Sequence, residues 1–104
     1  MDSSSEGSTD LCVFVRFQAR EGGEEQLLQA FHEMLPPVRA EAGCASINVF
    51  RATRVAGLFY LHSRWRDEAA FDLHAQMPHT LRFIERAQQL ITHDLVVTRS
   101  RMVE

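Results

Sequence analysis

Apolar and polar residues alternate along the segment 11–18, near the start of the chain. Val13, Val15 and Phe17 fall on one face of this segment, while Phe14 falls on the other. A period of two residues is typical of a β-strand, and apolar groups on both faces indicate that both faces are covered. Three later runs of apolar and aromatic residues are also predicted to be strands, at 44–51, 57–65 and 94–103.

Between positions 24 and 39 the apolar residues recur instead at steps of three and four, which predicts an amphipathic helix. The apolar stripe of this helix consists of Leu27, Leu28, Phe31, Met34, Leu35 and Val38. Pro36 and Pro37 are expected to kink or end the regular helix. Gly43 follows shortly afterwards and suits a C-terminal cap.

Two shorter helical segments follow the third strand, and Pro78 separates them. Asp67 is a suitable N-cap for the first, which is expected to run to about Met77. The apolar arc of that helix consists of Ala70, Phe71, Leu73, His74 and Met77. His74 is therefore expected to face the protein interior. The stripe of the second segment consists of Leu81, Phe83, Ile84, Ala87, Leu90 and Ile91.

The order of the predicted elements is β-α-β-β-α-α-β. If the last two helices are counted as one broken helix, this order is the ferredoxin-like βαββαβ pattern of the α+β class, with an antiparallel sheet. Helices cover only one face of such a sheet, whereas the first, third and fourth strands carry apolar residues on both faces. The uncovered face needs a partner, so we expect a homodimer whose sheets pack face to face.

Length and composition predict one domain. The chain has 104 residues, of which 45% are hydrophobic and 24% are charged, as is ordinary for a globular protein. The domain is assigned to 11–104, and the polar residues 1–10 are expected to form a disordered tail. The net charge of −3 provides no basic surface for nucleic acid. All eleven basic residues are Arg, which excludes catalysis through a lysine Schiff base.

The cysteines and the apolar runs indicate a cellular compartment. Cys12 and Cys44 lie outside any C-x-x-C motif and are expected to be buried free thiols. No apolar run reaches the roughly 18 residues of a membrane span. Residues 1–10 lack the features of a signal peptide. We therefore expect a cytoplasmic protein with neither a membrane nor a nucleic acid as partner.

One motif late in the chain resembles a known family. Trp65, the only Trp, is followed by His74 and then by the pair Pro78 and His79. This motif resembles the Trp-x8-His signature, with a Pro-His pair beyond it, of the antibiotic biosynthesis monooxygenase family. Shorter similarities to the same family lie at 20–22 and 41–44. The resemblance covers nearly the whole chain and implies a dimeric α+β barrel; the family includes cofactor-independent monooxygenases of quinols and polyketides.

His74 is the residue that we expect to act in catalysis. An imidazole has a pKa of about 6.5, so it can accept or donate a proton at neutral pH. An apolar setting favours its neutral form, as a general base requires. The alternative is a core histidine with one satisfied hydrogen bond.

Six further residues are candidates for binding a substrate. They are Asn48, Tyr60, His62, Arg64, Trp65 and His79. Tyr60, His62 and Arg64 share one face of the third strand. If that face lines a cavity, these residues contact a polar substrate; if it faces a dimer partner, they form interface hydrogen bonds.

The other three candidates also have structural alternatives. Asn48 could polarise a carbonyl or enolate oxygen, or pair with a neighbouring strand. Trp65 is favoured as an anchor between the sheet and a helix over a group that stacks on substrate. His79 either lines the mouth of a pocket or packs at the start of a helix.

The chain departs from the family at three positions. Ile47 stands where members often carry a Tyr, and His62 and Ser63 stand where many carry a Tyr and a Glu. The missing Glu removes one possible acid–base or orienting group. These departures keep non-oxidative and non-enzymatic functions open.

No cofactor and no metal are expected. The spacing of His74 and His79 across Pro78 does not resemble a zinc motif, and Gly22-Gly23 lacks the rest of a phosphate-binding loop. The haem-degrading branch of the family uses an Asn, a Trp and a His, and none of them is found at the corresponding positions, Val15, His74 and Ile84. Haem degradation is therefore not expected.

The resemblance implies a monooxygenase that oxidises a small phenolic, quinol or polyketide-like aromatic substrate, with O2 as co-substrate. His74 would remove a proton, the substrate anion would pass an electron to O2, and Asn48 or Arg64 would hold the anion. One alternative is a non-oxidative isomerase or lyase acting on a small carbonyl metabolite. Another is a non-enzymatic dimer that binds small molecules.

Overall fold

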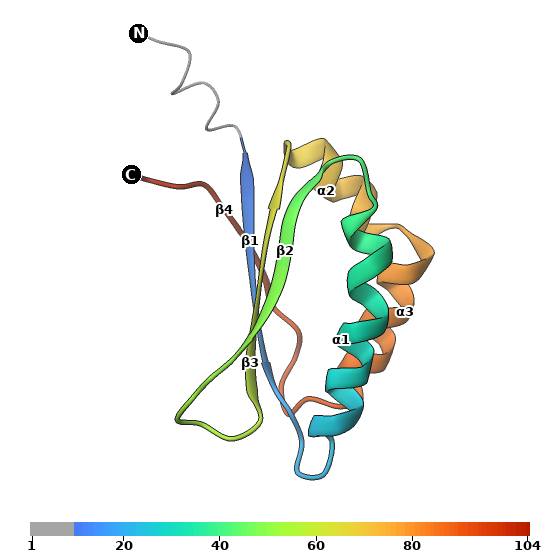
Figure 1. Ribbon diagram of the computed structural model, residues 1–104, viewed down its shortest axis with the longest axis vertical. Helices are drawn as coiled ribbons and strands as arrows, with labels where there is room; N and C mark the ends of the chain where they lie inside the picture. The colour runs from blue at the N-terminus through green and yellow to red at the C-terminus, as the bar shows by residue number, and fades with distance from the viewer. Residues whose placement is uncertain (1–9) are drawn as a thin grey trace, which may run out of the picture.

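Four strands form one antiparallel sheet, and three helices cover one of its faces (Figure 1). The computed structural model describes residues 10–104. Its elements are β1 (Leu11–Gln18), α1 (Glu24–Arg39), β2 (Cys44–Arg51), β3 (Leu58–Trp65), α2 (Glu68–Ala75), α3 (Pro78–Gln88) and β4 (Val97–Ser100). The strand order β2-β3-β1-β4 confirms the ferredoxin-like prediction. The disordered tail expected at 1–10 lies, apart from Asp10, outside the described residues.

The pairing of β1 with its two neighbours sets the inner face of the sheet. Val13 of β1 pairs with Ser63 of β3 on one side and with Arg99 of β4 on the other. Directly paired residues point to the same face, so these three side chains point toward the helices. The core beneath includes the fully buried Leu11, Phe17, Leu27, Phe31, Val38, Phe59 and Trp65. Their close packing fixes the helices over the sheet.

Helix α1 continues through Pro36 and Pro37, so the prediction that these prolines could end it is wrong. Both lie in the last turn, where their missing N–H groups would otherwise bond the carbonyls of His32 and Glu33. These two residues are exposed, so water can replace the lost bonds. Val38 is buried and holds the last turn against the core.

The predicted cap at Gly43 is also wrong, because Ala40 is the C-cap of α1. Gly43 instead lies against α2, where a Cβ atom would overlap the Cβ of Ala70. Its carbonyl accepts a hydrogen bond from the backbone N–H of Arg66 at 2.9 Å. A glycine at this position therefore lets the start of β2 approach α2 closely.

Helix α2 begins as predicted. The side chain of Asp67 accepts a hydrogen bond from the backbone N–H of Ala70 at 2.8 Å, which confirms the N-cap. The helix ends at Ala75, two residues earlier than expected. Met77 is extended, as the residue before a proline prefers, and Pro78 begins α3.

Strand β4 is shorter than the predicted 94–103 and contains only Val97–Ser100. Leu95 packs against the core, so the chain joins the sheet only after this point, at Val97. Ser100 is the last residue paired with β1.

The second face of the sheet carries no helix of the described chain (Figure 1). Phe14, Phe50 and Tyr60 on this face are 50%, 55% and 46% exposed. The ring of Phe14 lies on that of His62, with 4.8 Å between the centroids. None of the helices within residues 10–104 has both the length and the apolar character needed to cross a membrane.

Candidate active site

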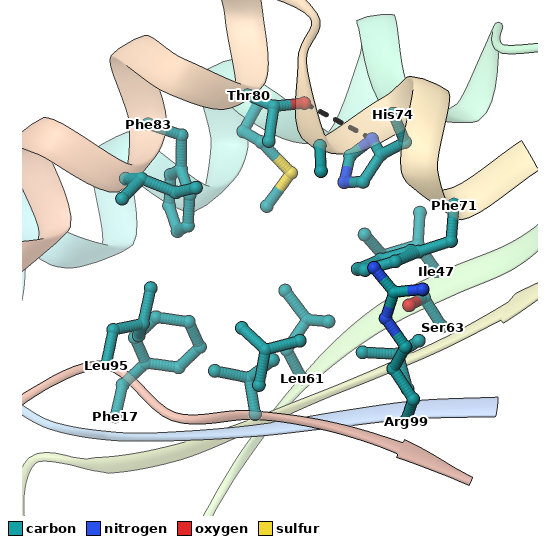
Figure 2. Close-up of a pocket in the computed structure, with 16 residues that line it drawn as sticks. Phe17, Ile47, Leu61, Ser63, Phe71, His74, Thr80, Phe83, Leu95 and Arg99 are labelled. Carbon is teal, nitrogen blue, oxygen red and sulfur yellow. Dashed lines mark hydrogen bonds between the residues drawn. The ribbon is translucent and has the colours of Figure 1, made fainter. Parts of the chain in front are cut away.

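A cavity of about 360 Å³ lies between the inner face of the sheet and the helices (Figure 2). Its apolar walls are formed by Val13, Val15, Phe17, Met34, Ile47, Leu61, Phe71, Ala75, Phe83, Ile84, Leu95 and Val97. Four polar residues complete the lining: Ser63, His74, Thr80 and Arg99. A small, mostly apolar space with a few polar groups is typical of a site for a small organic molecule.

His74 lies on α2 and reaches the cavity from the helix side, as its place in the apolar arc predicts. Only 8% of the residue is exposed. Its ring packs on the indole of Trp65, with 4.4 Å between the centroids, and on Phe71 at 5.3 Å. These aromatic neighbours fix the plane of the imidazole.

Glu41 is the partner of His74 and is a residue that the sequence analysis missed. Its Oε2 atom lies 2.9 Å from Nδ1 of His74 and 2.7 Å from Nε2 of His79. Glu41 lies in the connection between α1 and β2, whereas the histidines come from α2 and from the start of α3. The distance in sequence hides this cluster, and no local spacing marks it.

The contact with Glu41 selects the tautomer of His74. An ionised carboxylate only accepts hydrogen bonds, so Nδ1 of His74 donates its proton to Glu41 and Nε2 keeps a free lone pair. Figure 2 shows this second nitrogen turned toward the cavity, while Nδ1 lies on the side of Thr80. The Thr80 hydroxyl oxygen is 3.2 Å from Nδ1 and can accept a second, weaker hydrogen bond from the same N–H group.

Burial lowers the pKa of His74 below its usual value, because a charged imidazolium would lose solvation inside the protein. The hydrogen bond and the charge of Glu41 act in the opposite direction but are the smaller effects. His74 is thus neutral at neutral pH and presents a basic nitrogen to the cavity. This arrangement suits a general base.

Trp65 is fully buried behind His74 and does not line the cavity. Its indole N–H donates a hydrogen bond to the hydroxyl of Ser63 at 2.9 Å. The favoured interpretation of Trp65 as a core anchor is therefore consistent with the structure. Ser63, which stands where many family members carry a Glu, holds the indole in place and reaches the cavity wall.

Four of the predicted substrate-binding residues lie outside the cavity. Tyr60, His62 and Arg64 point away from the helices, Asn48 lies on the edge strand β2 within reach of Arg39 of α1, and none of the four lines the cavity. The Asn48 side chain accepts a hydrogen bond from Arg39 at 3.2 Å. A role in binding a substrate stays a prediction for these four. The structure does not bring them to His74.

Arg99 of β4 is a further residue at the cavity that the sequence analysis did not single out. Its guanidinium lies over the ring of Phe71 and donates to carboxylates of Glu68 and Asp72, both at 2.8 Å. These hydrogen bonds raise the pKa of Arg99. Because two carboxylates already balance its charge, Arg99 serves chiefly to tie β4 to α2 at the cavity wall.

The sequence model of the family described as antibiotic biosynthesis monooxygenase matches residues 10–86. The chain belongs to this family. This match confirms the resemblance predicted from the Trp65, His74 and His79 motif. The cavity beside His74 therefore lies in a protein of this family.

Two relatives of this antibiotic biosynthesis monooxygenase family protein have names that include the word monooxygenase. "Putative monooxygenase Rv0793" of Mycobacterium tuberculosis is 30% identical over 91 residues, covering 88% of this chain and 89% of the relative. "Putative monooxygenase YcnE" of Bacillus subtilis is 28% identical over 80 residues, covering 77% and 84%. The solved structure of Rv0793 matches with a TM-score of 0.86 at 28% identity, covering 91% of this chain and 96% of that one. These similarities support a general monooxygenase-like function.

Proposed function

We propose that the chain is a monooxygenase that uses O2 to oxidise a small phenolic, quinol or polyketide-like aromatic substrate in the cavity. The observation that carries the proposal is the setting of the His74 ring. One nitrogen is held by Glu41 at 2.9 Å, and the other faces an apolar cavity. Family membership and the names of the relatives support the reaction class.

The first step is removal of a proton from a substrate hydroxyl by Nε2 of His74. The imidazolium that forms has its new charge next to the carboxylate of Glu41. An ion pair in a water-poor site is stronger than the same pair in water, so Glu41 stabilises the charged ring. Glu41 does not touch the substrate, and it acts as a positioning residue for His74.

The substrate anion then gives one electron to O2. The superoxide and the substrate radical combine, which forms a bond between a ring carbon and oxygen. The imidazolium of His74 returns its proton to this peroxide. The O–O bond breaks as the distal oxygen leaves with the hydrogen of that carbon as water, and a carbonyl remains. The substrate supplies the electrons, so this reaction requires no separate reductant.

The walls of the cavity fit a flat aromatic body. Twelve of the sixteen lining residues are apolar, and the polar ones include His74 and its neighbour Thr80. An aromatic substrate can pack against the apolar walls while its hydroxyl meets Nε2 of His74. Such walls also keep water away from the anion and from superoxide.

An oxygen electrode with a panel of quinols, naphthols and anthrones tests this function. We expect O2 uptake with at least one substrate, and a loss of about 100-fold or more in His74→Gln, since general base catalysis contributes about 10²–10⁴-fold. His32→Gln, on the exposed side of α1, is the matched control and should keep the wild-type rate. The absence of O2 uptake across the panel, or His74-dependent isomerisation under anaerobic conditions, would contradict the proposal.

We also propose that the chain forms a homodimer through the open face of its sheet. Phe14, Phe50 and Tyr60 expose large apolar surfaces there. Exposed aromatic groups on a helix-free sheet favour association with a second sheet, and a second copy offers the same surface. Light scattering should give a dimeric mass at micromolar concentration and a shift toward monomer in Phe50→Glu. A monomeric wild type would contradict the proposal.

A further inference from the structure

Three potential metal ligands converge beside the cavity. They are Oε2 of Glu41, Nδ1 of His74 and Nε2 of His79, and all three atoms lie within 4.8 Å of one another. We propose that this cluster binds one divalent transition-metal ion of the Zn²⁺ class, in place of the protons that now join the three side chains. Two imidazoles and one carboxylate are a donor set that suits zinc and its neighbours better than Mg²⁺ or Ca²⁺.

The spacing of the ligand atoms is close to what a metal requires. Tetrahedral zinc holds nitrogen and oxygen ligands at about 2.0–2.2 Å, which places them roughly 3.3 Å apart. The carboxylate oxygen lies 2.9 and 2.7 Å from the two nitrogens, because protons now occupy the spaces between them. Separation by about half an ångström would admit the ion. The side chain of His79, in the first turn of α3, can rotate to supply this movement.

Burial and access also fit a metal site. The side chains of Glu41, His74 and His79 are 10%, 11% and 17% exposed. They are therefore largely shielded from water, which strengthens their attraction for a cation. His79 also lines a second groove, between α1 and α3, together with Arg82 and Glu85. This groove gives an ion a path to the cluster.

The cluster leaves room for a fourth ligand. Three protein ligands are the usual number where zinc keeps one position open. The Thr80 hydroxyl is 3.2 Å from Nδ1 of His74, beside the proposed ion. Either this oxygen or a water molecule from the groove can complete a tetrahedron.

Metal binding would change the chemistry of His74, a consequence that rests on the proposed function. A neutral imidazole that gives the Nδ1 lone pair to a metal carries its proton on Nε2. The atom that faces the cavity then becomes a hydrogen-bond donor and no longer accepts a proton. Zinc at this cluster would therefore inhibit oxidation, so the metal and the catalytic proton compete for the same ring.

Calorimetric titration of the tag-free, chelator-treated full chain with ZnCl2 tests the site. We expect one ion per chain, together with the visible absorption of a tetrahedral complex when CoCl2 is used. Glu41→Gln and His79→Asn should each weaken Zn²⁺ binding by more than about 10- to 100-fold. A loss of that size is typical when a residue that only hydrogen-bonds a metal ligand is removed. His32→Asn, on the exposed side of α1, should bind as the wild type does.

Failure of the wild type to bind either ion at micromolar concentration would overturn the proposal, as would unchanged binding in His79→Asn. If Glu41→Gln does not fold, as judged by circular dichroism, His79→Asn carries the test alone because its side chain is partly exposed. The titration uses no substrate. An active protein that binds no zinc would overturn the metal site alone. A protein that binds zinc but shows no O2 uptake in its metal-free form would overturn the proposed oxidation alone.

Discussion

The Oε2 atom of Glu41 and the Nδ1 atom of His74 lie 2.9 Å apart, although 33 positions separate them in the sequence. Glu41 lies between α1 and β2, and His74 lies in the last turn of α2. Their side chains are only 10% and 11% exposed. A carboxylate in this position fixes one nitrogen of the imidazole and leaves the other free toward the cavity. The proposed function depends on this pair.

Glu41→Gln tests the positioning role. The amide oxygen can still accept a hydrogen bond, but the negative charge is lost, so we expect kcat/KM for oxidation to fall roughly 10- to 100-fold. Glu41 raises the pKa of His74, so its removal should move the acid limb of the pH profile to lower pH. Glu25→Gln, in the exposed first turn of α1, is the control. A variant with the rate and pH profile of the wild type would contradict the role.

Stability should depend on pH through His74. Its pKa is lowered in the folded protein, chiefly by burial, while Glu41 and His79 are the titratable groups that face it. Below its unfolded pKa of about 6.5, the unfolded chain binds the proton more readily. The free energy of unfolding should therefore fall as pH drops from 7 toward the folded pKa, by at most about 1.4 kcal/mol per pH unit for this single proton.

Urea denaturation between about pH 7.5 and 5, a range that spans the usual histidine pKa, measures this dependence, with chelator present to keep the protein metal-free. His74→Gln should show a smaller loss of stability on acidification than the wild type. His32→Gln, whose side chain is exposed, should keep the wild-type slope. Identical slopes in the wild type and His74→Gln would show that another group controls the acid response.

Ser63→Ala should destabilise the fold through Trp65. The substitution leaves the buried indole N–H without its acceptor, which costs about 1–3 kcal/mol of unfolding free energy. Trp65→Phe removes the donor as well, so the double variant should lose less than the sum of the single losses, by about 0.5–3 kcal/mol. Urea denaturation of the four proteins measures this coupling. Strictly additive losses would mean that the hydrogen bond contributes nothing.

Gly43→Ala should destabilise by overlap with Ala70. A methyl group at position 43 meets the Cβ of Ala70, and such overpacking costs about 1–3 kcal/mol. Ala70→Gly removes the obstructing methyl group, so the double variant should recover part of the stability lost in Gly43→Ala. Thermal denaturation of the three variants gives the comparison. No loss in Gly43→Ala would show that the connection before β2 shifts freely.

Periodicity was sufficient to predict the elements and their order. The alternation in β1 and the three- and four-residue steps of α1 each define one buried face, and the Asp67 cap marks the start of α2. The same logic placed His74 inside the protein. The ends of elements were less predictable. Leu95 packs against the core instead of starting β4, and Gly43 lets β2 approach α2 closely. Both depend on contacts between distant segments.

The site itself depends on such distant contacts, which explains what the sequence analysis missed. Glu41, His74 and His79 come from three segments that meet only when the helices pack. Alternation showed that Tyr60, His62 and Arg64 share a face, but it could not show which face the helices cover. Arg99 gave no local signal, because its position depends on the pairing of β4 with β1.

The most direct test of the central claim is oxidation under ¹⁸O2 of whichever aromatic substrate supports O2 uptake. Mass spectrometry of the product should show one labelled oxygen atom per molecule, and water should receive the other. The rate of label incorporation should fall about 100-fold or more in His74→Gln. An unlabelled product, or incorporation at the wild-type rate in His74→Gln, would contradict a monooxygenase reaction that uses His74 as its base.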